Sequence, residues 1–445
     1  MASRDTVWGW RSRRAGLGTL VTAVTAVIVA SGAGCGARGG GNTVVFWEFW
    51  PREQIQPVLD DFAKLHPEIH VDVQQLTWSD GPQKITAAVA SGTVPDLCEL
   101  GSTQFAQYAA AGALKDITPL ADSLRDQYRA WDMVTYQNHV FGLPWVVGSR
   151  ALFYNKVLFA RAGLDSTKAP ETWSELKVAS EKVQALGGDL HGNGLNAGER
   201  LIFVKKFMPY AWGNGGEVLS ADQSRSLVNS PENLEALQFY LSLKPSSMVQ
   251  RQETLDQAFM QGKIGINLSG PWLFNKIPAD APNLRYGVGL VPRPDKASGI
   301  HASFMGGELL VFFSKAKANP AAVTLARYLT SREAAGKLAH AARFVAANVG
   351  AEDDPYYAAH PREGVLARQM KTARALPAVP QWGDIEDALT TSLDEAVLGK
   401  TPAEDALRNA DEKITAILHN ASATSNVGAL APRRGAGRGQ VASSR

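Results

Sequence analysis

The fold is decided by residues 43–73, which read TVVFWEFWPREQIQPVLDDFAKLHPEIHVDV. Residues 43–47 form a short apolar run that is typical of a buried strand. Residues 69–73 alternate between apolar and polar side chains, as a second strand does. Between them, apolar residues recur at helical spacing, and Pro67 follows where the helix should end. These apolar residues are Ile55, Val58, Leu59, Phe62 and Leu65.

The next segment repeats this alternation. A second helix is predicted to end at Gly92, and residues 95–100, PDLCEL, read as a third strand. Cys98 within it is interpreted as a small core residue. Strand–helix–strand order favours a parallel sheet with helices on both faces. We therefore predict an α/β fold.

Elements are also marked in the second half. Thr172 and Glu175 form a capping box, in which each side chain satisfies a free backbone N–H at the start of a helix. Ser230 and Thr401, each followed by proline, begin two more helices. Residues 263–268 and 306–313 read as strands.

Length and charge narrow the class of protein. A chain of 445 residues, 45% hydrophobic and 20% charged, suits two soluble lobes. The formal charge of +2 comes from the two ends, since residues 35–420 carry about −5. A protein that binds nucleic acid needs a basic face, and none is evident, so nucleic acid is not an expected partner.

The N-terminus has the parts of an export signal. Residues 1–34 combine a basic segment with an uncharged run that ends in small residues, and Cys35 follows directly. This order resembles a bacterial lipobox, with Cys35 acylated as the mature N-terminus and Gly32 where an aliphatic residue is usual. The alternative is an uncleaved membrane anchor. We predict a Gly-rich tether over 35–42 and a disordered tail over 421–445.

Cys98 is the only cysteine besides Cys35, so no internal disulfide is expected. The eight histidines lack the spacing of metal ligands. We expect neither a metal nor a cofactor.

The order of several short motifs carries a family resemblance. From about Thr43 to Asn420 the chain resembles the extracellular solute-binding proteins of family 1, the maltose-binding-protein-like group. The motifs that carry it are FWE at 46–48, GTVPD at 92–96, FGLP at 141–144, LFYNK at 152–156, FMQGK at 259–263, GPW at 270–272 and GG at 306–307. One departure is the absence of proline after the helix over 331–339, which weakens the transfer of ligand contacts near Arg343.

The resemblance implies a two-lobed periplasmic-binding-protein-like fold. Each lobe would be a mostly parallel sheet flanked by helices, and hinge strands would join the lobes near residues 148–151, 294–303 and 350. Lobe 1 would comprise 43–149 and 304–349, and lobe 2 would comprise 150–303 and 350–420. A monomer would close on a solute and present it to the permease subunits of an ABC importer, while a lipid holds it to the membrane.

A polyhydroxylated solute needs aromatic platforms and polar side chains. Residue type, position at strand ends and the resemblance together select the ligand-binding candidates, with Trp272 foremost as a stacking ring; Trp173 is expected in the core. The candidates are Trp47, Glu48, Trp78, Glu99, Ser102, Trp145, Tyr210, Trp212, Trp272, Gly306, Gly307, Glu308 and Trp382.

Other readings stay open. Arg150 and Arg343 are possible anion contacts, so the same fold could bind glycerol 3-phosphate or a glycerophosphodiester. Glu48, Glu99 and Glu308 oppose an anion, and a sugar or oligosaccharide is favoured. More distant readings are a secreted glycoside hydrolase that uses two carboxylates, and an adhesive lipoprotein without a ligand. We expect a binding protein and no enzyme.

Overall fold

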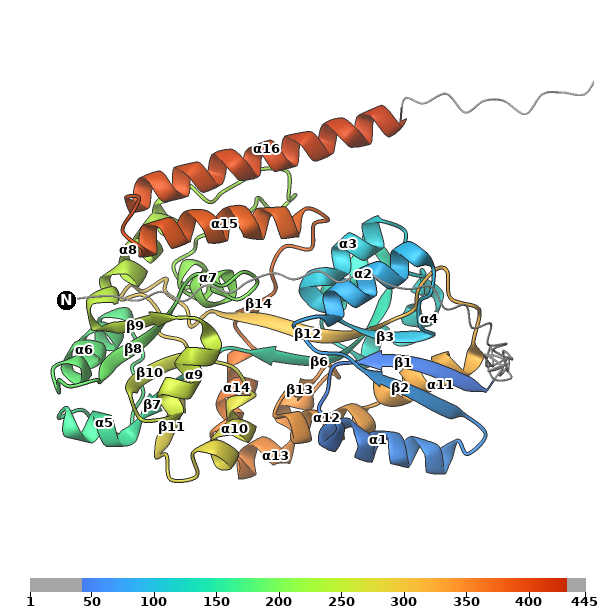
Figure 1. Cartoon of the computed structure of the whole chain (residues 1–445), viewed down its shortest axis with the longest axis horizontal. Helices are drawn as coiled ribbons and strands as arrows, with labels where there is room; N and C mark the ends of the chain where they lie inside the picture. The colour runs from blue at the N-terminus through green and yellow to red at the C-terminus, as the bar shows by residue number, and fades with distance from the viewer. Residues whose placement is uncertain (1–41, 430–445) are drawn as a thin grey trace, which may run out of the picture. The chain divides into compact units, whose positions relative to one another are not determined.

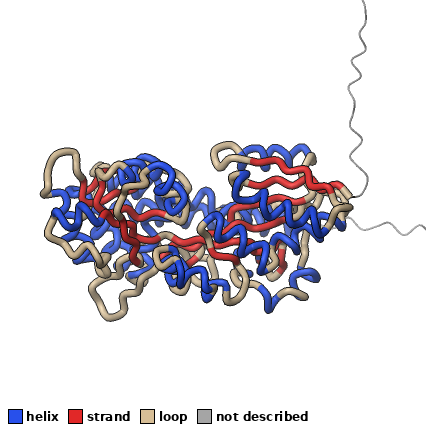
Figure 2. Tube along the Cα trace, turned by 90° about the horizontal axis from the view of Figure 1, so that it is seen from below, coloured by secondary structure: helices blue, strands red, loops and turns tan. Residues whose placement is uncertain are grey.

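The computed structural model of the chain describes residues 42–429. The predicted signal peptide and Cys35 lie outside these residues, as does the tether up to residue 41. The described part contains two main β-sheets flanked by helices (Figures 1 and 2). The mixed α/β class predicted from the sequence is therefore confirmed.

The first sheet has the order β13-β6-β12-β3-β1-β2, and β14 pairs with β12. Its strands are β1 (Thr43–Glu48), β2 (His70–Gln75), β3 (Leu97–Gly101), β6 (Gly142–Ser149), β12 (Ser303–Val311), β13 (Val345–Ala346) and β14 (Ala373–Arg374). Its helices are α1 (Arg52–Leu65), α2 (Gly81–Ser91), α3 (Ser102–Ala110), α4 (Thr118–Asp122), α11 (Pro320–Leu329), α12 (Arg332–Ala342) and α13 (Pro355–Ala359). A small hairpin, β4 (Thr135–Tyr136) and β5 (His139–Val140), lies apart from the sheet.

The first elements follow the sequence pattern closely. The face of α1 that carries Ile55, Val58 and Phe62 is buried, as its helical spacing predicts. Helix α2 ends at Gly92 in the left-handed conformation (φ 76°), which a residue without Cβ adopts at little cost. Cys98 is fully buried, as expected.

The second sheet has the order β11-β7-β10-β8-β9. Its strands are β7 (Ala151–Asn155), β8 (His191–Asn196), β9 (Ser247–Gln250), β10 (Ile264–Ser269) and β11 (Tyr286–Gly289). Its helices are α5 (Lys156–Arg161), α6 (Trp173–Gln184), α7 (Phe203–Gly213), α8 (Pro231–Ser242), α9 (Gln252–Met260), α10 (Leu273–Asp280), α14 (Glu363–Gln369), α15 (Trp382–Val397) and α16 (Ala403–Ala429). Short 3₁₀ turns are η1 (Arg125–Gln127), η2 (Trp131–Val134), η3 (Lys244–Ser246) and η4 (Ala351–Asp353).

The predicted helix starts have the expected caps. The Glu175 N–H donates to the Thr172 hydroxyl (3.3 Å), and the Glu175 carboxylate accepts from the Glu171 N–H (2.7 Å). The Ser230 hydroxyl caps α8 by accepting from the Asn233 N–H (3.2 Å). Trp173, at the start of α6, is buried and stacks on Phe239, which confirms its core assignment.

Both sheets are more mixed than the parallel arrangement expected from the first three strands. Strands β1, β2 and β3 are parallel, whereas β12 is antiparallel to β3 and β6. In the second sheet β7 is antiparallel to β10 and β11, while β8 is parallel to β9 and β10. The reversed strands are those by which the chain enters a sheet from the other one: β12 in the first sheet and β7 in the second. The hydrophobic periodicity of a single strand does not show the direction of its neighbours.

Two passages of the chain between the sheets lie side by side. Strand β6 ends at Ser149 and β7 begins at Ala151, so only Arg150 separates the sheets there. Strand β12 pairs with β6 up to Met305 and Ser149. The Ser303 hydroxyl accepts from the Arg150 N–H (3.1 Å) and donates to the Arg150 carbonyl (2.8 Å). One side chain thus ties the two passages together.

A third passage lies at α14, later than residue 350. Tyr357 is buried in the first core, and its hydroxyl donates to the Phe344 carbonyl (3.0 Å). Within α14, Ala367 packs in the first core, whereas Val365 and Leu366 pack beside the second sheet. Helix α16 continues to Ala429, past the predicted start of the tail at residue 421, and residues 430–445 lie outside the description.

The helices between residues 42 and 429 include none with the length and apolar character that a bilayer crossing requires.

Candidate ligand-binding site between the two sheets

Three carboxyl groups gather at one edge of the first sheet. Glu48 ends β1, Glu99 lies in the neighbouring β3, and Glu308 of β12 pairs in register with Gly101. Because β1 and β3 are parallel, their carboxyl ends meet at the same edge, where ligands bind in such sheets. Glu48 and Glu99 are fully buried.

These carboxyl groups are only partly satisfied by the protein. One oxygen of Glu48 accepts from the Trp50 N–H (2.6 Å), and one oxygen of Glu99 accepts from the Phe49 N–H (2.8 Å). The other oxygen of each, and Oε2 of Glu308, are buried without a hydrogen-bond partner. Buried polar atoms in native proteins are nearly always paired, so unpaired ones concentrated in one place point to a missing partner.

Burial also changes how these groups ionise. Desolvation raises the pKa of Glu48 to about 7 and that of Glu308 to about 8. The pKa of Glu99 is raised by its burial and further by the negative charges of Glu308 and Glu48. The three carboxyl groups at this edge of the sheet therefore keep their protons to a higher pH than exposed carboxyl groups do.

An exposed aromatic ring borders this cluster. Trp78, in the loop after β2, is 51% exposed and stacks on Phe49 at a centroid distance of 4.2 Å. A Cβ on Gly101 would lie 3.3 Å from the Trp78 ring and 3.7 Å from Oε2 of Glu308. Both groups therefore lie close to the backbone of Gly101, where a side chain would crowd the Trp78 ring.

Arg150 faces the cluster from between the sheets. Its guanidinium lies 4.6 Å from the centre of the Trp272 ring and 5.4 Å from that of Phe304. It is buried, its Nε has no partner, and desolvation lowers its pKa to about 10 although Asp256 and Glu308 are near enough to oppose that shift. A buried cation held by two rings, without a paired carboxylate, leaves donors available.

Asp256 of α9 sets the position of Trp272. Its Oδ2 accepts from the Trp272 indole N–H (2.8 Å), and its Oδ1 accepts from Asn267 Nδ2 and the Ser269 hydroxyl (2.8 Å each). Three donors from β10 and the turn before α10 thus converge on one carboxylate. The carboxylate orients the ring that covers Arg150.

On the side of the site that the second sheet and its helices form, α7 and α15 contribute further polar groups. Lys205 lies 5.5 Å from the Phe304 ring centre, and burial lowers its pKa although Glu386 and Glu308 are close. Burial raises the pKa of Glu386. The buried Trp382 indole interacts with the Glu386 carboxyl and partly opposes that rise.

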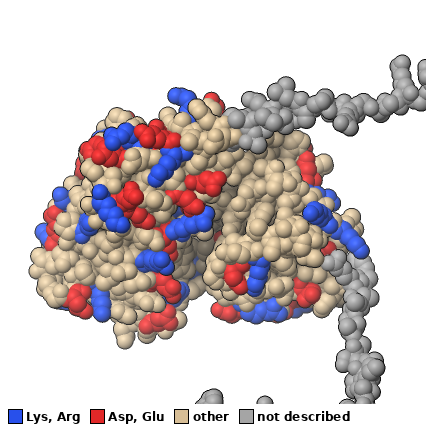
Figure 3. Space-filling model, turned by 45° about the horizontal axis from the view of Figure 1, so that its top comes forward, with Lys and Arg blue, Asp and Glu red and all other residues tan. Residues whose placement is uncertain are grey.

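Several predicted site residues lie together here. Glu48, Glu99 and Glu308 form the cluster, Trp78 borders it, and Trp272 covers Arg150. Trp382, at the start of α15, is 3% exposed and packs in the second core, so it is not a ligand contact here. Figure 3 shows the surface hollowed between two bodies of the described part, with Lys and Arg interspersed among Asp and Glu.

Three predicted aromatic contacts are instead in the cores. Trp145 is buried against Phe46 and Trp50, and its indole N–H donates to the Leu329 carbonyl (2.9 Å). Tyr210 and Trp212 on α7 are 3% exposed and pack in the second core. Their assignment as ligand contacts is corrected, because protein atoms cover their ring faces.

The predicted backbone contacts also have partners within the protein. The Gly307 N–H donates to the Ser102 hydroxyl (3.2 Å), and a Cβ at Gly307 would lie 2.7 Å from the Val146 carbonyl. A Cβ at Gly306 would lie 2.7 Å from the Phe304 ring. The close packing around β12 therefore explains why both positions are glycine. The Ser102 hydroxyl is already bonded to the backbone of Gly307.

Trp47 and Arg343, the two remaining predicted residues, lie at the margin of the candidate site. Trp47 is half-buried on the face of β1 opposite Glu48, because neighbouring side chains in a strand alternate. Arg343 follows α12 with a left-handed backbone (φ 66°), and its Nε donates to Asn275 Oδ1 (3.1 Å). It therefore links the two halves rather than pointing at the carboxyl cluster.

Sequence reasoning missed Asp256, Phe304, Lys205, Glu386 and Gly101. Asp256 and Lys205 lie within helices whose apolar pattern gives no sign that one polar side chain faces a ligand. Gly101 stood between two predicted residues, Glu99 and Ser102, and its position at a strand end was the available signal.

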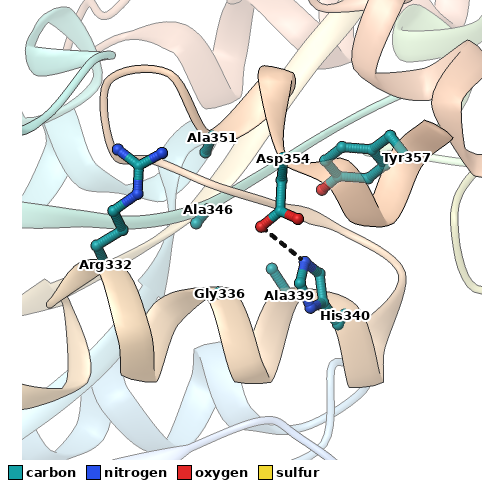
Figure 4. A pocket seen from close by; sticks show the side chains of 8 residues that line it. All are labelled: Arg332, Gly336, Ala339, His340, Ala346, Ala351, Asp354 and Tyr357. Atoms are coloured by element: carbon teal, nitrogen blue, oxygen red, sulfur yellow. Dashed lines mark ion pairs between the residues drawn. The ribbon is translucent and has the colours of Figure 1, made fainter. Parts of the chain in front are cut away.

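A small pocket outside this region lies between α12 and the segment around α13 (Figure 4). His340 and Asp354 point toward each other in it, with Nε2 3.3 Å from Oδ2. Arg332, on its other side, donates to the carbonyls of Val349 and Gly350. Because these polar groups already have partners, the pocket reads as a gap in helix packing.

Comparison with known proteins identifies relatives of this chain. A Brucella abortus (strain 2308) protein for which no solute is named is 28% identical over 370 residues, covering 80% of this chain and 88% of its own. The structure of an ABC transporter solute-binding protein from Thermotoga lettingae, bound with α-D-tagatose, is 27% identical with a TM-score of 0.75, and the match covers 85% of this chain and all of that one.

A second structure, a Mycobacterium tuberculosis protein in complex with glycerophosphocholine, is 18% identical with a TM-score of 0.76 over 85% of this chain and 99% of that one, and shows the shared fold alone. The family described as bacterial extracellular solute-binding protein matches residues 51–336, more than half of the chain. Together with the two-sheet architecture, this match shows that the chain belongs to the bacterial extracellular solute-binding protein family.

Proposed function

We propose that this protein binds a sugar, or another polyhydroxylated solute, in the hollow between the two sheets. The observation that carries the proposal is the set of buried polar atoms without partners that converge there. They belong to Glu48, Glu99, Glu308 and Arg150. They include both donors and acceptors, beside the Trp78 and Trp272 rings.

A sugar matches these groups chemically. Each hydroxyl both donates and accepts, so it satisfies carboxyl oxygens on one side and the guanidinium on the other. The weakly apolar C–H face of a pyranose or furanose ring packs on an indole. The tagatose-bound relative supports the same class of solute.

A phosphate ester is the second candidate, and Arg150 is the group that favours it. A phosphate is best held by paired donors in the absence of nearby negative charge. Here Glu308 and Asp256 lie close enough to act on the charge of Arg150. This balance of charge favours a sugar over glycerol 3-phosphate or a glycerophosphodiester.

The separate hydrophobic cores around the two sheets suggest a motion of one half of the protein against the other. We propose that the core around the first sheet and the cores around the second sheet are two lobes, which close on the solute by bending near Arg150, Ser303 and α14. The closed monomer would then deliver the solute to the permease subunits of an ABC importer. Acylation of Cys35 would hold the protein at the outer face of the cell membrane.

The test is a thermal-shift and tryptophan-fluorescence titration with mono-, di- and oligosaccharides, polyols and glycerophosphodiesters. A solute at 100 times its Kd should stabilise the protein by about 2.7 kcal/mol, because it binds only the folded state. Trp272→Ala should abolish the shift, whereas Trp131→Phe, a change outside the site, should leave it intact. Recovery of the solute unchanged distinguishes binding from hydrolysis, and a response to phosphodiesters alone would refute the sugar proposal.

A further inference from the structure

Within the proposed site, Glu48 and Glu99 stand apart from the other acids. Both side chains are fully buried, and neither belongs to an ion pair within 4 Å among the described residues. Each has one oxygen bound to a backbone N–H and the other without a partner. A buried carboxylate without a counter-charge is costly, and most proteins pair it.

The cations near Glu48 and Glu99 interact mainly with other groups. Arg150 and Lys205 lie against aromatic rings, and their charges act on Glu308, Asp256 and Glu386. Arg52 acts on Glu48 but is exposed on α1, and no positive charge contributes to the ionisation of Glu99. Among the described residues, the cations of the second side therefore act on other acids, the exposed Arg52 is the cation that acts on Glu48, and none acts on Glu99.

We infer that the solute supplies the missing cation and is an amino sugar, whose protonated amine binds between Glu48 and Glu99. This inference rests on the proposed function and names the class of sugar. An ammonium brings a positive charge and three N–H donors, enough for both partnerless oxygens. A neutral hydroxyl satisfies one acceptor at a time and brings no positive charge that would allow both carboxyl groups to ionise.

Two alternatives fit the same groups less well. If Glu99 were a neutral acid in a purely structural role, its O–H would need an acceptor, and Oε1 has none. A metal ion would need a compact set of ligands, and no group of three or more His, Cys, Asp or Glu side chains among the described residues has that geometry.

The experiment compares matched solutes on the intact protein. Calorimetry at pH 7 would measure the glucosamine disaccharide, its N-acetylated form and cellobiose, which share the same β-1,4 skeleton, together with glycerophosphocholine. The amine should bind at least about tenfold more tightly than the other two sugars. It should also release protons, because an ammonium favours ionised carboxylates, so its binding heat should differ between phosphate and Tris buffers.

Variants locate the effect. Glu99→Gln keeps an oxygen for the Phe49 N–H and removes the charge, so it should reduce the amine preference to near unity while retaining affinity for cellobiose. Glu333→Gln, exposed on α12, is the matched surface control.

The outcomes separate the two proposals. Equal binding of all three disaccharides, or binding of another neutral sugar alone, overturns the amino-sugar inference and leaves sugar binding intact. An amine preference that survives Glu99→Gln also overturns it. Binding of glycerophosphocholine without any sugar, or no carbohydrate binding at all, refutes both.

Discussion

Glu308 lies in the middle of β12, where burial raises its pKa to about 8, and Glu48 at the end of β1 behaves similarly with a pKa near 7. Residues of this kind mark the proposed site, because each loses its hydration on burial and does not regain all of its hydrogen bonds from the protein. Such groups are retained where a ligand completes them. The cost should therefore be visible in the stability of the protein without ligand.

The ligand-free protein should lose stability as the pH rises from about 5 to about 8. A carboxyl with a raised folded-state pKa holds a proton that the unfolded chain has released, so its stabilising contribution is present at the acidic end and declines up to the folded pKa. Each pKa unit corresponds to about 1.4 kcal/mol. Positive charges on Arg150 and Lys205 limit the effect at Glu308.

Urea denaturation across this pH range checks the prediction. Glu308→Gln should flatten the decline, while Glu333→Gln should leave the slope unchanged. Lys206, whose pKa burial lowers to about 8, acts mainly above this window. An unchanged slope in Glu308→Gln would contradict the assignment of Glu308 as a proton-retaining group.

At the scale of elements, the site depends on helices that present polar groups to strand ends. Helix α9 supplies Asp256, which receives donors from β10 and from Trp272 before α10. The sequence pattern of α9 predicts the buried face of Leu255 and Phe259, and Asp256 lies beside them. Its role appears only when the strand and both helices are assembled.

Asp256→Asn should therefore both destabilise the protein and weaken solute binding. An amide retains one acceptor oxygen but turns an NH₂ group toward at least one of the three donors, so a loss of roughly 1–3 kcal/mol is expected. Trp272 should lose its fixed orientation, which near-ultraviolet circular dichroism detects. Asp222→Asn, exposed in a turn before α8, is the control. Normal binding in Asp256→Asn would show that Trp272 is positioned by packing alone.

At the scale of the whole molecule, contacts of α10 with the end of α12 connect the two halves. Asn275 donates to the Ala341 carbonyl (2.9 Å) and accepts from Arg343 (3.1 Å). Arg343 adopts a left-handed backbone, which costs a non-glycine residue about 1–2 kcal/mol and persists where surrounding contacts require it. These hydrogen bonds join α10 to the end of α12, and we propose that they act as a latch between the lobes.

Asn275→Ala should weaken solute binding several-fold by removing both hydrogen bonds, while the folding of each half is preserved. Small-angle scattering should report a larger radius of gyration for the solute-bound variant than for the solute-bound wild type. Lys276→Ala, its exposed neighbour on α10, should change neither quantity. An unaltered affinity in Asn275→Ala would show that closure does not depend on this contact.

Much of the fold was predictable because its signals are local. Hydrophobic spacing located α1, β1 and β3, the Thr172 cap located α6, and strand ends marked Glu48 and Glu99 as candidates, which lie together at one edge of the first sheet. The errors concern aromatic residues. Trp145, Tyr210 and Trp212 have the composition expected of sugar platforms, but the core and a binding cleft both suit an aromatic ring, and sequence spacing does not distinguish them.

The sequence by itself determined the α/β class, the family and the acids at the first strand ends, because periodicity, caps and ordered motifs are properties of short segments. Only the tertiary structure decided the mixed direction of the strands, the placement of Arg150 between two rings and, among the described residues, the burial of Glu48 and Glu99 without an ion pair. These features arise from residues far apart in the chain. Their energies depend on burial and on neighbouring charge, which exist only once both halves are folded.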